Sequence, residues 1–451
     1  MTTNRFEQIP EEWLRRREGL GIWEGRSKAV AVGTGASDTS RRWDWDPQTS
    51  VGANAISALR RAMDDAGVTG DQVDGLIVVP DTTTGRFTWP PAWSEDRDVP
   101  GDMAAAFEMV DDPRVGMAGL STEWIIKNMP ELTNVEFAAH IPSDTAPALI
   151  GAVEAVVRGL TKVCLVVKGW HNLAGRYYVG QGAANGDTIA TREKWSTGWG
   201  TVGVYQEATR FQRYLWKYGK RKEMFANFVV NSKRNGLNFP EGFFAQNRPE
   251  DIVTREDYLG ARWLAKPANL YDADIPICAA AAFLFTTPER AKDMKQKPVY
   301  VLGHTSTQPP ARSLQHTLEE EEAAAASSGR KLLEAAGISV SDYSFENMYD
   351  GYGMFHAIHV EGLGYAGIKQ GDFLDFVENE DITNEGPHPI SPSGGNIGSG
   401  RTRFWLHMDT MQQLQGRAGA RQMTGVKPEI GVDGANFPQN FHGLVWGANP
   451  D

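Results

Sequence analysis

Apolar residues recur at helical spacing between residues 51 and 66, where Ala55, Leu59 and Ala62 would share one face of a helix. Gly67 follows directly, and glycine often ends helices because it adopts the left-handed conformation freely. The next apolar run, GLIVV, is short and continuous, as is typical of a strand covered on both faces. Together with KAVAVGTGASD, which reads as a buried strand running into a glycine turn, these stretches predict a strand–helix–strand unit.

A second pattern, HIPSDTAPALIGAVEAVVRGLTKVCLVV at residues 140–167, predicts a turn, a helix and a buried strand. Small residues such as Ser143 and Thr145 crowd the start of this helix, which lets a ligand or another helix come close. The free N–H groups of a helix N-terminus also favour a nucleophile there. The turn holds Pro142 and Asp144 instead, and no cysteine.

The strand–helix–strand unit returns in the second half of the chain. SSGRKLLEAAGISVSDYSFENMYDG predicts a helix ending at Ala336–Gly337, a polar turn and a strand that ends at Tyr349. When Ala336–Gly337 is aligned with Ala66–Gly67, the run that begins at Gly75 falls against Phe345. Such an internal repeat predicts two related α/β halves, with parallel strands and crossover helices.

A polar and aromatic insertion separates the two halves. The predicted organisation is an N-terminal arm at residues 1–28, a first half at 29–170, an insertion at 171–270 and a last segment at 271–451. The last segment begins with a strand that completes the first half and continues as the second half.

The insertion is the most basic part of an acidic chain. Its clearest predicted helix, VGVYQEATRFQRYLWKYG, places Ala208, Phe211 and Leu215 on one apolar face. Two interpretations stay open: the cations form a solvated helical face, or they bind the phosphates of a ligand. The basic residues are Arg210, Arg213, Lys217, Lys220, Arg221, Lys222, Lys233 and Arg234.

A glycine-rich loop, SPSGGNIGSG at residues 391–400, precedes a predicted helix. Glycines allow a ligand to approach the backbone closely, although this loop matches neither a P-loop nor a dinucleotide-binding fingerprint. The chain then ends on EIGVDGANFPQNFHGLVWG, two apolar segments joined by a polar turn.

Composition narrows the partners. The formal net charge of −12 argues against nucleic acid or an anionic membrane as a general partner. Cys164 and Cys278 lie in apolar runs and are expected to be buried thiols in a reducing compartment. No stretch approaches about 18 consecutive apolar residues, so we expect a soluble, cytoplasmic protein. Several tryptophans lie in loop-like contexts, which fits either an interface or small satellite cores: Trp43, Trp45, Trp89, Trp93, Trp195 and Trp199.

Four stretches carry a resemblance to a known family. They are AMDDAGVTGDQVDGLIV, FQRYLWKYGKRKEMFANFVVNSKRN, TREDYLGARWLAKPANLYDADIPICAAAAFLFTTPERA and YDGYGMFHAIHVEGLGY. From about residue 28 onward the chain resembles the thiolase superfamily, and most closely its lipid-transfer-protein or sterol-carrier-protein-like branch. The resemblance implies an α/β thiolase fold: two duplicated halves in a five-layer αβαβα sandwich, with an inserted loop domain that holds coenzyme A.

The chain departs from the thiolase pattern at each catalytic motif. The nucleophilic cysteine of thiolases would fall near Pro142 or Ser143. The His-Asp-Cys-Phe motif of the sterol-carrier branch is replaced by a tyrosine-led motif that begins at Tyr349. The Gly-His-Pro motif is replaced at Gly400–Arg401, and the final Cys-x-Gly motif by Asp433–Gly434. Covalent acyl transfer, which needs a thiolate and an activating histidine, is therefore disfavoured.

The resemblance implies a different reaction. Steroid side-chain-cleaving aldolases of this superfamily carry a tyrosine where thiolases have the histidine, and Tyr349 aligns with it. A retro-aldol cleavage of a β-hydroxyacyl-CoA needs no nucleophile. The expected catalytic residues are Tyr349, Arg401 and, as a weaker candidate acid or base, Asp433. Two alternatives stay open: a non-catalytic acyl-CoA-binding scaffold, and a covalent thiolase or acyltransferase with an unrecognised nucleophile.

The resemblance also implies ligands and partners. Coenzyme A is expected as part of the substrate, with no permanently bound cofactor and no metal. A homodimer is expected, and further a heterotetramer with a small protein that joins a zinc ribbon to an OB-fold. The residues expected to hold coenzyme A are Arg210, Arg213, Lys220, Arg221, Lys222, Gly395 and Gly434.

Overall fold

The computed structural model describes residues 19–80, 101–117, 119–142, 144–172, 204–307 and 317–451. Nine strands form one continuous mixed sheet in the order β3-β2-β4-β7-β1-β8-β11-β10-β9. The first five belong to the first half: β1 (Val30–Ala36), β2 (Gly75–Val79), β3 (Phe137–His140), β4 (Val163–Trp170) and β7 (Ala279–Thr286). The other four belong to the second half: β8 (Val299–Ser306), β9 (Phe345–Met348), β10 (Ile430–Ala435) and β11 (His442–Gly447).

The strand pairings show the duplication directly. In the first half β2 runs parallel to β4, and β7 pairs antiparallel with both β4 and β1. In the second half β9 runs parallel to β10, and β11 pairs antiparallel with both β10 and β8. The two halves join edge to edge where Val30 and Ala31 of β1 pair with Tyr300 and Val299 of β8.

The two repeats also match residue by residue, as the sequence alignment predicts. Helix α1 (Val51–Ala66) ends at Gly67 with φ 71°, and helix α11 (Leu318–Ala336) ends at Gly337 with φ 66°. A short 3-10 turn follows each glycine, and β2 and β9 then begin at equivalent positions. Both glycines are needed because this left-handed conformation is strained for other residues.

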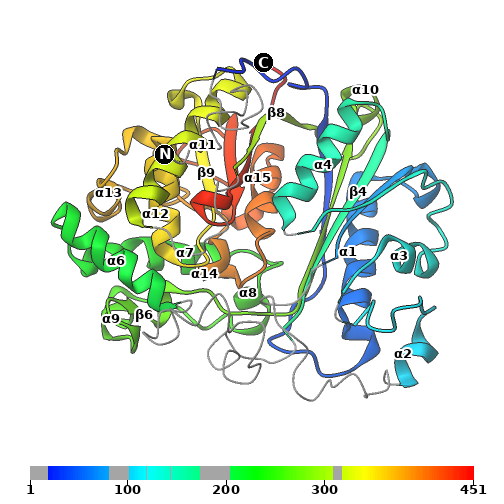
Figure 1. Ribbon diagram of the computed structural model, residues 1–451, viewed down its shortest axis with the longest axis horizontal. Coiled ribbons are helices and arrows are strands. Elements are labelled where there is room, and N and C mark those ends of the chain that lie inside the picture. The colour runs from blue at the N-terminus through cyan, green and yellow to red at the C-terminus, as the bar shows by residue number, and fades with distance from the viewer. Residues whose placement is uncertain (1–18, 81–100, 118, 143, 173–203, 308–316) are drawn as a thin grey trace, which may run out of the picture.

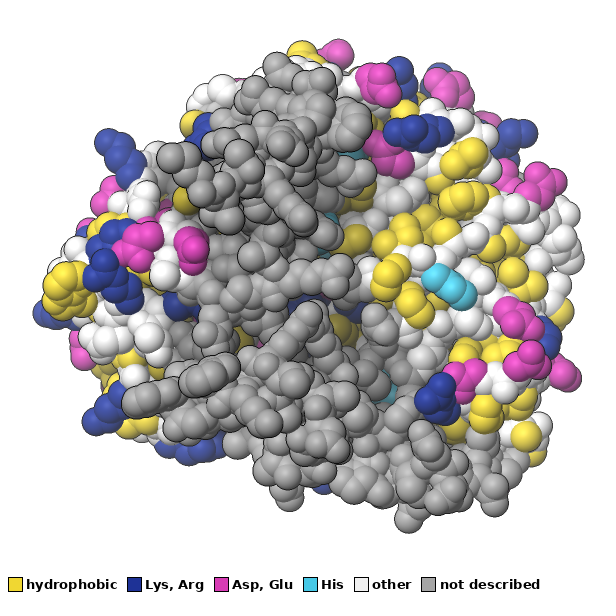
Figure 2. Space-filling model, in the orientation of Figure 1, with side chains coloured by type: hydrophobic (Ala, Val, Ile, Leu, Met, Phe, Trp, Pro, Cys, Tyr) yellow, Lys and Arg dark blue, Asp and Glu magenta, His cyan; other side chains and the backbone are white. Residues whose placement is uncertain are grey.

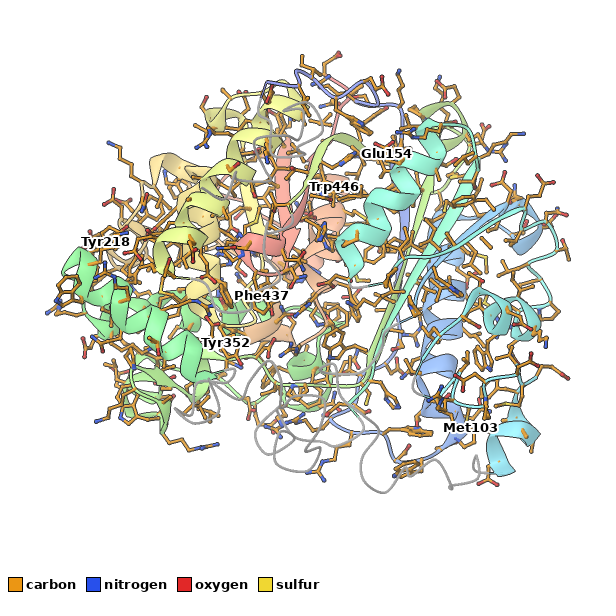
Figure 3. All side chains as sticks on the ribbon, in the orientation of Figure 1. Met103, Glu154, Tyr218, Tyr352, Phe437 and Trp446 are labelled. Carbon is orange, nitrogen blue, oxygen red and sulfur yellow. The ribbon has the colours of Figure 1, made fainter. Side chains whose placement is uncertain are left out.

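Helices cover the strands to give five layers, as expected for the thiolase fold (Figure 1). From right to left in that view lie α1 with α3 (Thr122–Asn128), the first-half strands, α4 (Thr145–Val157) with α15 (Trp405–Gln415), the second-half strands, and α11 with α12 (Gly353–Leu363). Helix α4 contacts strands of both halves and shares a core cluster with α15. Trp446 fills this middle layer (Figure 3).

The insertion packs against the second half. It contains α6 (Val204–Tyr218), α7 (Ala226–Leu237), α8 (Phe243–Asn247), α9 (Arg255–Gly260) and the strand pair β5 (Trp263–Ala265) and β6 (Ala268–Asn269). Shorter helices complete the fold: α2 (Gly101–Ala106), α10 (Pro288–Ala291), α13 (Phe373–Asn379) and α14 (Gly395–Ser399). None of the helices in the described ranges is both long and apolar enough to cross a membrane.

The tryptophans in loop-like contexts differ in burial. Trp43 is buried in a small satellite cluster with Met103 and Cys278, whereas Trp45 is 42% exposed. Trp89, Trp93, Trp195 and Trp199 lie outside the described residues.

Candidate active site between the two halves

Asp144 occupies the start of helix α4, the region where the thiolase pattern calls for a nucleophile. It is the N-cap residue of that helix and is fully buried. Its carboxylate accepts from the Lys168 ammonium at 2.6 Å and from Arg403 Nη1 at 2.8 Å. Burial alone would raise the pKa of Asp144, but the two cations outweigh burial and hold that pKa well below its usual value.

Lys168 projects from β4 toward the same point. It interrupts a fully buried strand, VCLVVKGW, and is itself fully buried. Burial lowers the pKa of Lys168 to about 8, because the attraction of Asp144 offsets desolvation only in part. Trp170, two residues further along the strand, lies under the Lys168 ammonium at 4.7 Å.

Arg401 and Arg403 enter the site from the loop between α14 and α15. Their guanidinium groups lie 5.5 and 5.7 Å from the ring of Trp170. Arg401 also lies 3.5 Å from Asp274 and donates its backbone N–H to Ile275. The loop thus brings two further cations to the place where Lys168 and Asp144 meet.

Tyr349 follows directly after β9 and is 1% exposed. Its hydroxyl lies 3.5 Å from Arg403 Nη2, and the Arg403 guanidinium lies 5.1 Å from its ring. Tyr352, Phe355 and Phe437 surround the ring as an aromatic cluster, and Figure 3 shows the labelled Tyr352 and Phe437 on the same side of the second half. Tyr349 therefore has an apolar wall on one side and a cation on the other.

Asp350 organises the glycine-rich loop. Its carboxylate accepts the backbone N–H groups of Asn396 and Ile397 at 2.6 and 3.0 Å, which gives Asp350 a structural role in this loop. Burial raises the pKa of Asp350 to about 6. A Cβ atom at Gly395 would lie 2.1 Å from Asp350, so this glycine is needed for the close approach of the loop.

Asp433 and Gly434 lie deeper, within β10. The Asp433 carboxylate faces His407 of α15, with Oδ1 3.0 Å from Nδ1, and both side chains are fully buried. A Cβ atom at Gly434 would lie 2.2 Å from Phe441. The structure thus brings Tyr349 and Arg401 to one site and places Asp433 beside His407. The coenzyme A role of Gly395 and Gly434 stays a prediction.

The basic residues of the insertion mostly form ion pairs with the second half. Arg213 pairs with Glu319 at 2.7 Å and Lys217 with Glu322 at 2.6 Å, both on α11. The remaining pairs are Arg210 with Glu207 and Glu321, Lys220 with Asp375, Lys222 with Asp272, and Arg234 with Glu385. Arg221 is exposed. Binding of coenzyme A by this stretch stays a prediction.

Both cysteines are buried, as the sequence indicates. Cys164 lies in β4, and burial raises the pKa of its thiol well above the ordinary value. Cys278 lies 3.5 Å from the His171 ring, and burial raises the pKa of its thiol to about 11. Neither thiol has the low pKa and exposure of a nucleophilic cysteine.

Sequence reasoning missed Lys168 and Arg403 as site residues. A usable signal existed for Lys168, because a lysine inside an otherwise apolar strand is rarely buried without a paired charge. Arg403 was harder to find, since its side chain reaches Asp144 only through the conformation of the loop.

The comparisons with known proteins agree with this architecture. Residues 310–433 match the family model described as "Thiolase C-terminal domain-like". The chain is 25% identical over 435 residues to the 17-hydroxy-3-oxo-4-pregnene-20-carboxyl-CoA lyase of Mycobacterium tuberculosis, covering 93% of this chain and 99% of that protein. It is 24% identical over 243 residues to sterol carrier protein 2 of Gallus gallus, covering 50% of this chain and 42% of that protein.

Solved structures give the same fold. An Ltp2-ChsH2(DUF35) aldolase superposes with a TM-score of 0.72 at 19% identity, over 94% of this chain and 98% of that chain. Human mitochondrial 3-ketoacyl-CoA thiolase superposes with a TM-score of 0.60 at 10% identity, over 94% and 100% of the two chains. These matches show that the chain has the thiolase fold, with a thiolase C-terminal-like domain at residues 310–433.

Proposed function

We propose that this protein is an acyl-CoA carbon–carbon lyase that cleaves a β-hydroxyacyl-CoA by a retro-aldol reaction. The observation that carries the proposal is the contact between the Tyr349 hydroxyl and the Arg403 guanidinium, in a site whose helix N-terminus holds Asp144. The similarity to a CoA lyase over nearly the whole of both chains supports the same reaction class.

The reaction needs a base, an oxyanion donor and an acid. Tyr349, ionised beside Arg403, takes the proton of the substrate β-hydroxyl. The bond between the α- and β-carbons then breaks, and its electron pair passes to the thioester as an enolate. Arg401 supplies a cation for that enolate oxygen, since arginine cannot act as a base at neutral pH. The ketone or aldehyde forms as this bond breaks. The proton that Tyr349 accepted then returns to the α-carbon to give the shortened acyl-CoA, so the reaction balances with no oxidant.

Coenzyme A enters this reaction as part of the substrate. The relative from Mycobacterium tuberculosis is named for a steroid-derived acyl-CoA, so we propose a bulky apolar acyl group that packs against the aromatic cluster around Tyr349. The solved aldolase is described together with ChsH2(DUF35), and we propose a partner of that kind for this chain.

The direct test is an assay of the purified chain, with and without such a partner, on a β-hydroxyacyl-CoA. Mass spectrometry should find a ketone or aldehyde together with a shortened acyl-CoA. Tyr349→Phe should lower turnover by at least about 100-fold, the usual effect of losing a general acid or base. Turnover within about threefold of wild type would remove Tyr349 from the mechanism.

A control separates this mechanism from covalent acyl transfer. The double variant Cys164→Ala and Cys278→Ala should keep its turnover and resist iodoacetamide, because both thiols are buried away from the Tyr349 contacts. A folded but inactive double variant would restore the covalent mechanism. A protein that binds acyl-CoA and cleaves nothing, with or without partner, would instead be a scaffold.

A further inference from the structure

Lys168 lies inside the proposed lyase site, yet no step of the reaction above uses it. Its side chain is fully buried, and its ammonium lies 2.6 Å from Asp144 Oδ1. Burying a lysine carries a desolvation cost even when the lysine is paired. A charge held there at that cost calls for a role within the site.

Asp144 is shared between two cations. Lys168 contacts Oδ1 at 2.6 Å, and Arg403 contacts Oδ2 at 2.8 Å. A single carboxylate therefore stands between one lysine and one arginine, and these three side chains together carry one net positive charge. Without the lysine, Asp144 and Arg403 would form a neutral pair.

The Arg403 guanidinium is held in place at a cost. Its backbone has φ 65°, in the left-handed region, which is strained for a residue with a side chain. The Asn396 side-chain oxygen fixes this turn by accepting the N–H groups of Thr402 and Arg403 at 3.0 and 2.9 Å. The result is a guanidinium that reaches Asp144 and Tyr349 at once.

We propose that Lys168 is a positioning residue of this site: by neutralising Asp144, it leaves the charge of Arg403 available to stabilise the Tyr349 phenolate. The catalytic part of this inference rests on the proposed function. The effect of the charge at Lys168 on the ionisation of Tyr349 can be measured without any turnover. In this arrangement Lys168 acts on Tyr349 through Asp144 and Arg403.

The net charge of Lys168, Asp144 and Arg403 should change at alkaline pH. The groups that face Asp144 are Lys168 from β4, Arg403 from the loop before α15, and His442 from β11. Arg401 from the same loop acts on Lys168 and pairs with Asp274, and Tyr349 is reached through Arg403. Burial lowers the pKa of His442 to about 4, so His442 is neutral near pH 8. Because the pKa of Lys168 is about 8, the triad falls from one positive charge to none as the pH rises through that value.

The test places a fluorotyrosine at position 349 and follows its ionisation by fluorine NMR. Lys168→Met makes the group of Asp144, Arg403 and residue 168 neutral. The ionisation midpoint of the fluorotyrosine should therefore rise by about one pH unit or more, a tenfold change in proton affinity. Asp144→Asn adds one positive charge to the triad and should lower the midpoint. The double variant restores one net charge and should return near the wild-type midpoint.

Lys168→Arg is the matched control, because it keeps the charge and cannot lose it near pH 8. Its midpoint should stay near that of wild type, and its turnover should lack the alkaline decline that we expect of wild type above about pH 8. If Asp144→Asn does not fold, the Lys168→Met and Lys168→Arg pair still decides the question. Equal midpoints in wild type and Lys168→Met would overturn the inference. If the fluorotyrosine midpoints change in the predicted order but no substrate is cleaved, the result would count against the lyase function alone.

Discussion

His442 at the start of β11 is a buried imidazole whose proton affinity folding reduces. Its Nδ1 lies 2.9 Å from Ser306 Oγ, and burial lowers its pKa to about 4 although Asp144 attracts the proton. An unfolded histidine has a pKa of about 6.5, so between these values the unfolded chain binds more protons. The stability that His442 contributes is therefore present above about pH 6.5 and is lost as the pH falls toward 4.

His442→Gln should remove this dependence while keeping a polar group for Ser306. Near neutral pH we expect the variant to be slightly less stable than wild type. At about pH 4.5 the difference should shrink or reverse, by about 2–3 kcal/mol, as followed by urea denaturation at both pH values. Parallel stability profiles for the two proteins would show that His442 does not titrate as its burial implies.

Also at the scale of residues, the role of a residue within a recognised motif was easier to predict than the contacts that its side chain makes. Tyr349 was placed by resemblance to a motif. Lys168 was hidden in an apolar run, and Arg403 reaches the site only because its own φ is positive. Such side-chain directions depend on tertiary structure that no local pattern encodes.

At the scale of elements, the sequence predicted boundaries well where a local signal exists. Gly67 ends α1 and Gly337 ends α11, both in the left-handed conformation. The partner of the basic helix α6 was not predicted. The acidic run LEEEE at the start of α11 is distant in sequence, yet it supplies carboxylates to Arg213 and Lys217.

Arg221 offers the clearest test of coenzyme A binding by the insertion. It is exposed, and within the described ranges it forms no ion pair, whereas Lys222 is held by Asp272 and packed on Tyr258. Arg221→Glu should raise KM several-fold with similar kcat, because phosphate contacts are equal in the ground and transition states. The matched control is Lys427→Glu, an exposed reversal on the second half. Equal KM values in both variants would assign the stretch a structural role.

Helices α7 and α14 meet backbone to backbone, which makes one glycine indispensable. A Cβ atom at Gly236 would lie 1.9 Å from the Gly398 carbonyl oxygen. We expect Gly236→Ala to lower the free energy of unfolding by at least about 2 kcal/mol, as overpacking of rigid backbone does. Gly260→Ala, at a helix end with open space around it, should be neutral or slightly stabilising. An equal loss of unfolding free energy in both variants would contradict this packing. The contact also bears on the site, because the loop that holds Arg403 follows α14.

At the scale of the whole molecule, the site belongs to neither half alone. The first half supplies Asp144 and Lys168 at the ends of α4 and β4, and the second half supplies Tyr349 and Arg403. The duplicated strand order places these elements face to face across the middle layer. A mutation that loosens the β1–β8 junction should therefore affect activity before it affects either core.

The remaining expectation concerns self-association through the outer edge of the first half. Strand β3 ends the sheet and pairs only with β2 among the described strands. Ala138 and His140 are exposed on it, and no lysine or proline blocks this edge. Nearby lie the half-buried apolar residues Phe137, Ala139, Ile141, Ile150 and Val157, and Figure 2 shows apolar side chains gathered over the region of α4.

An open apolar edge of this kind fits a second copy of the chain, and the thiolase resemblance implies a homodimer. We predict that the purified chain is a dimer by light scattering and that Ala138→Lys shifts it to monomer, because the two new charges would face each other across the edge. Ala420→Lys, an equal change at an exposed site in the second half, should leave the dimer intact. A dimer that persists in Ala138→Lys would place the interface elsewhere, and a monomeric wild type would leave this edge for the DUF35-type partner, whose addition should then bury it.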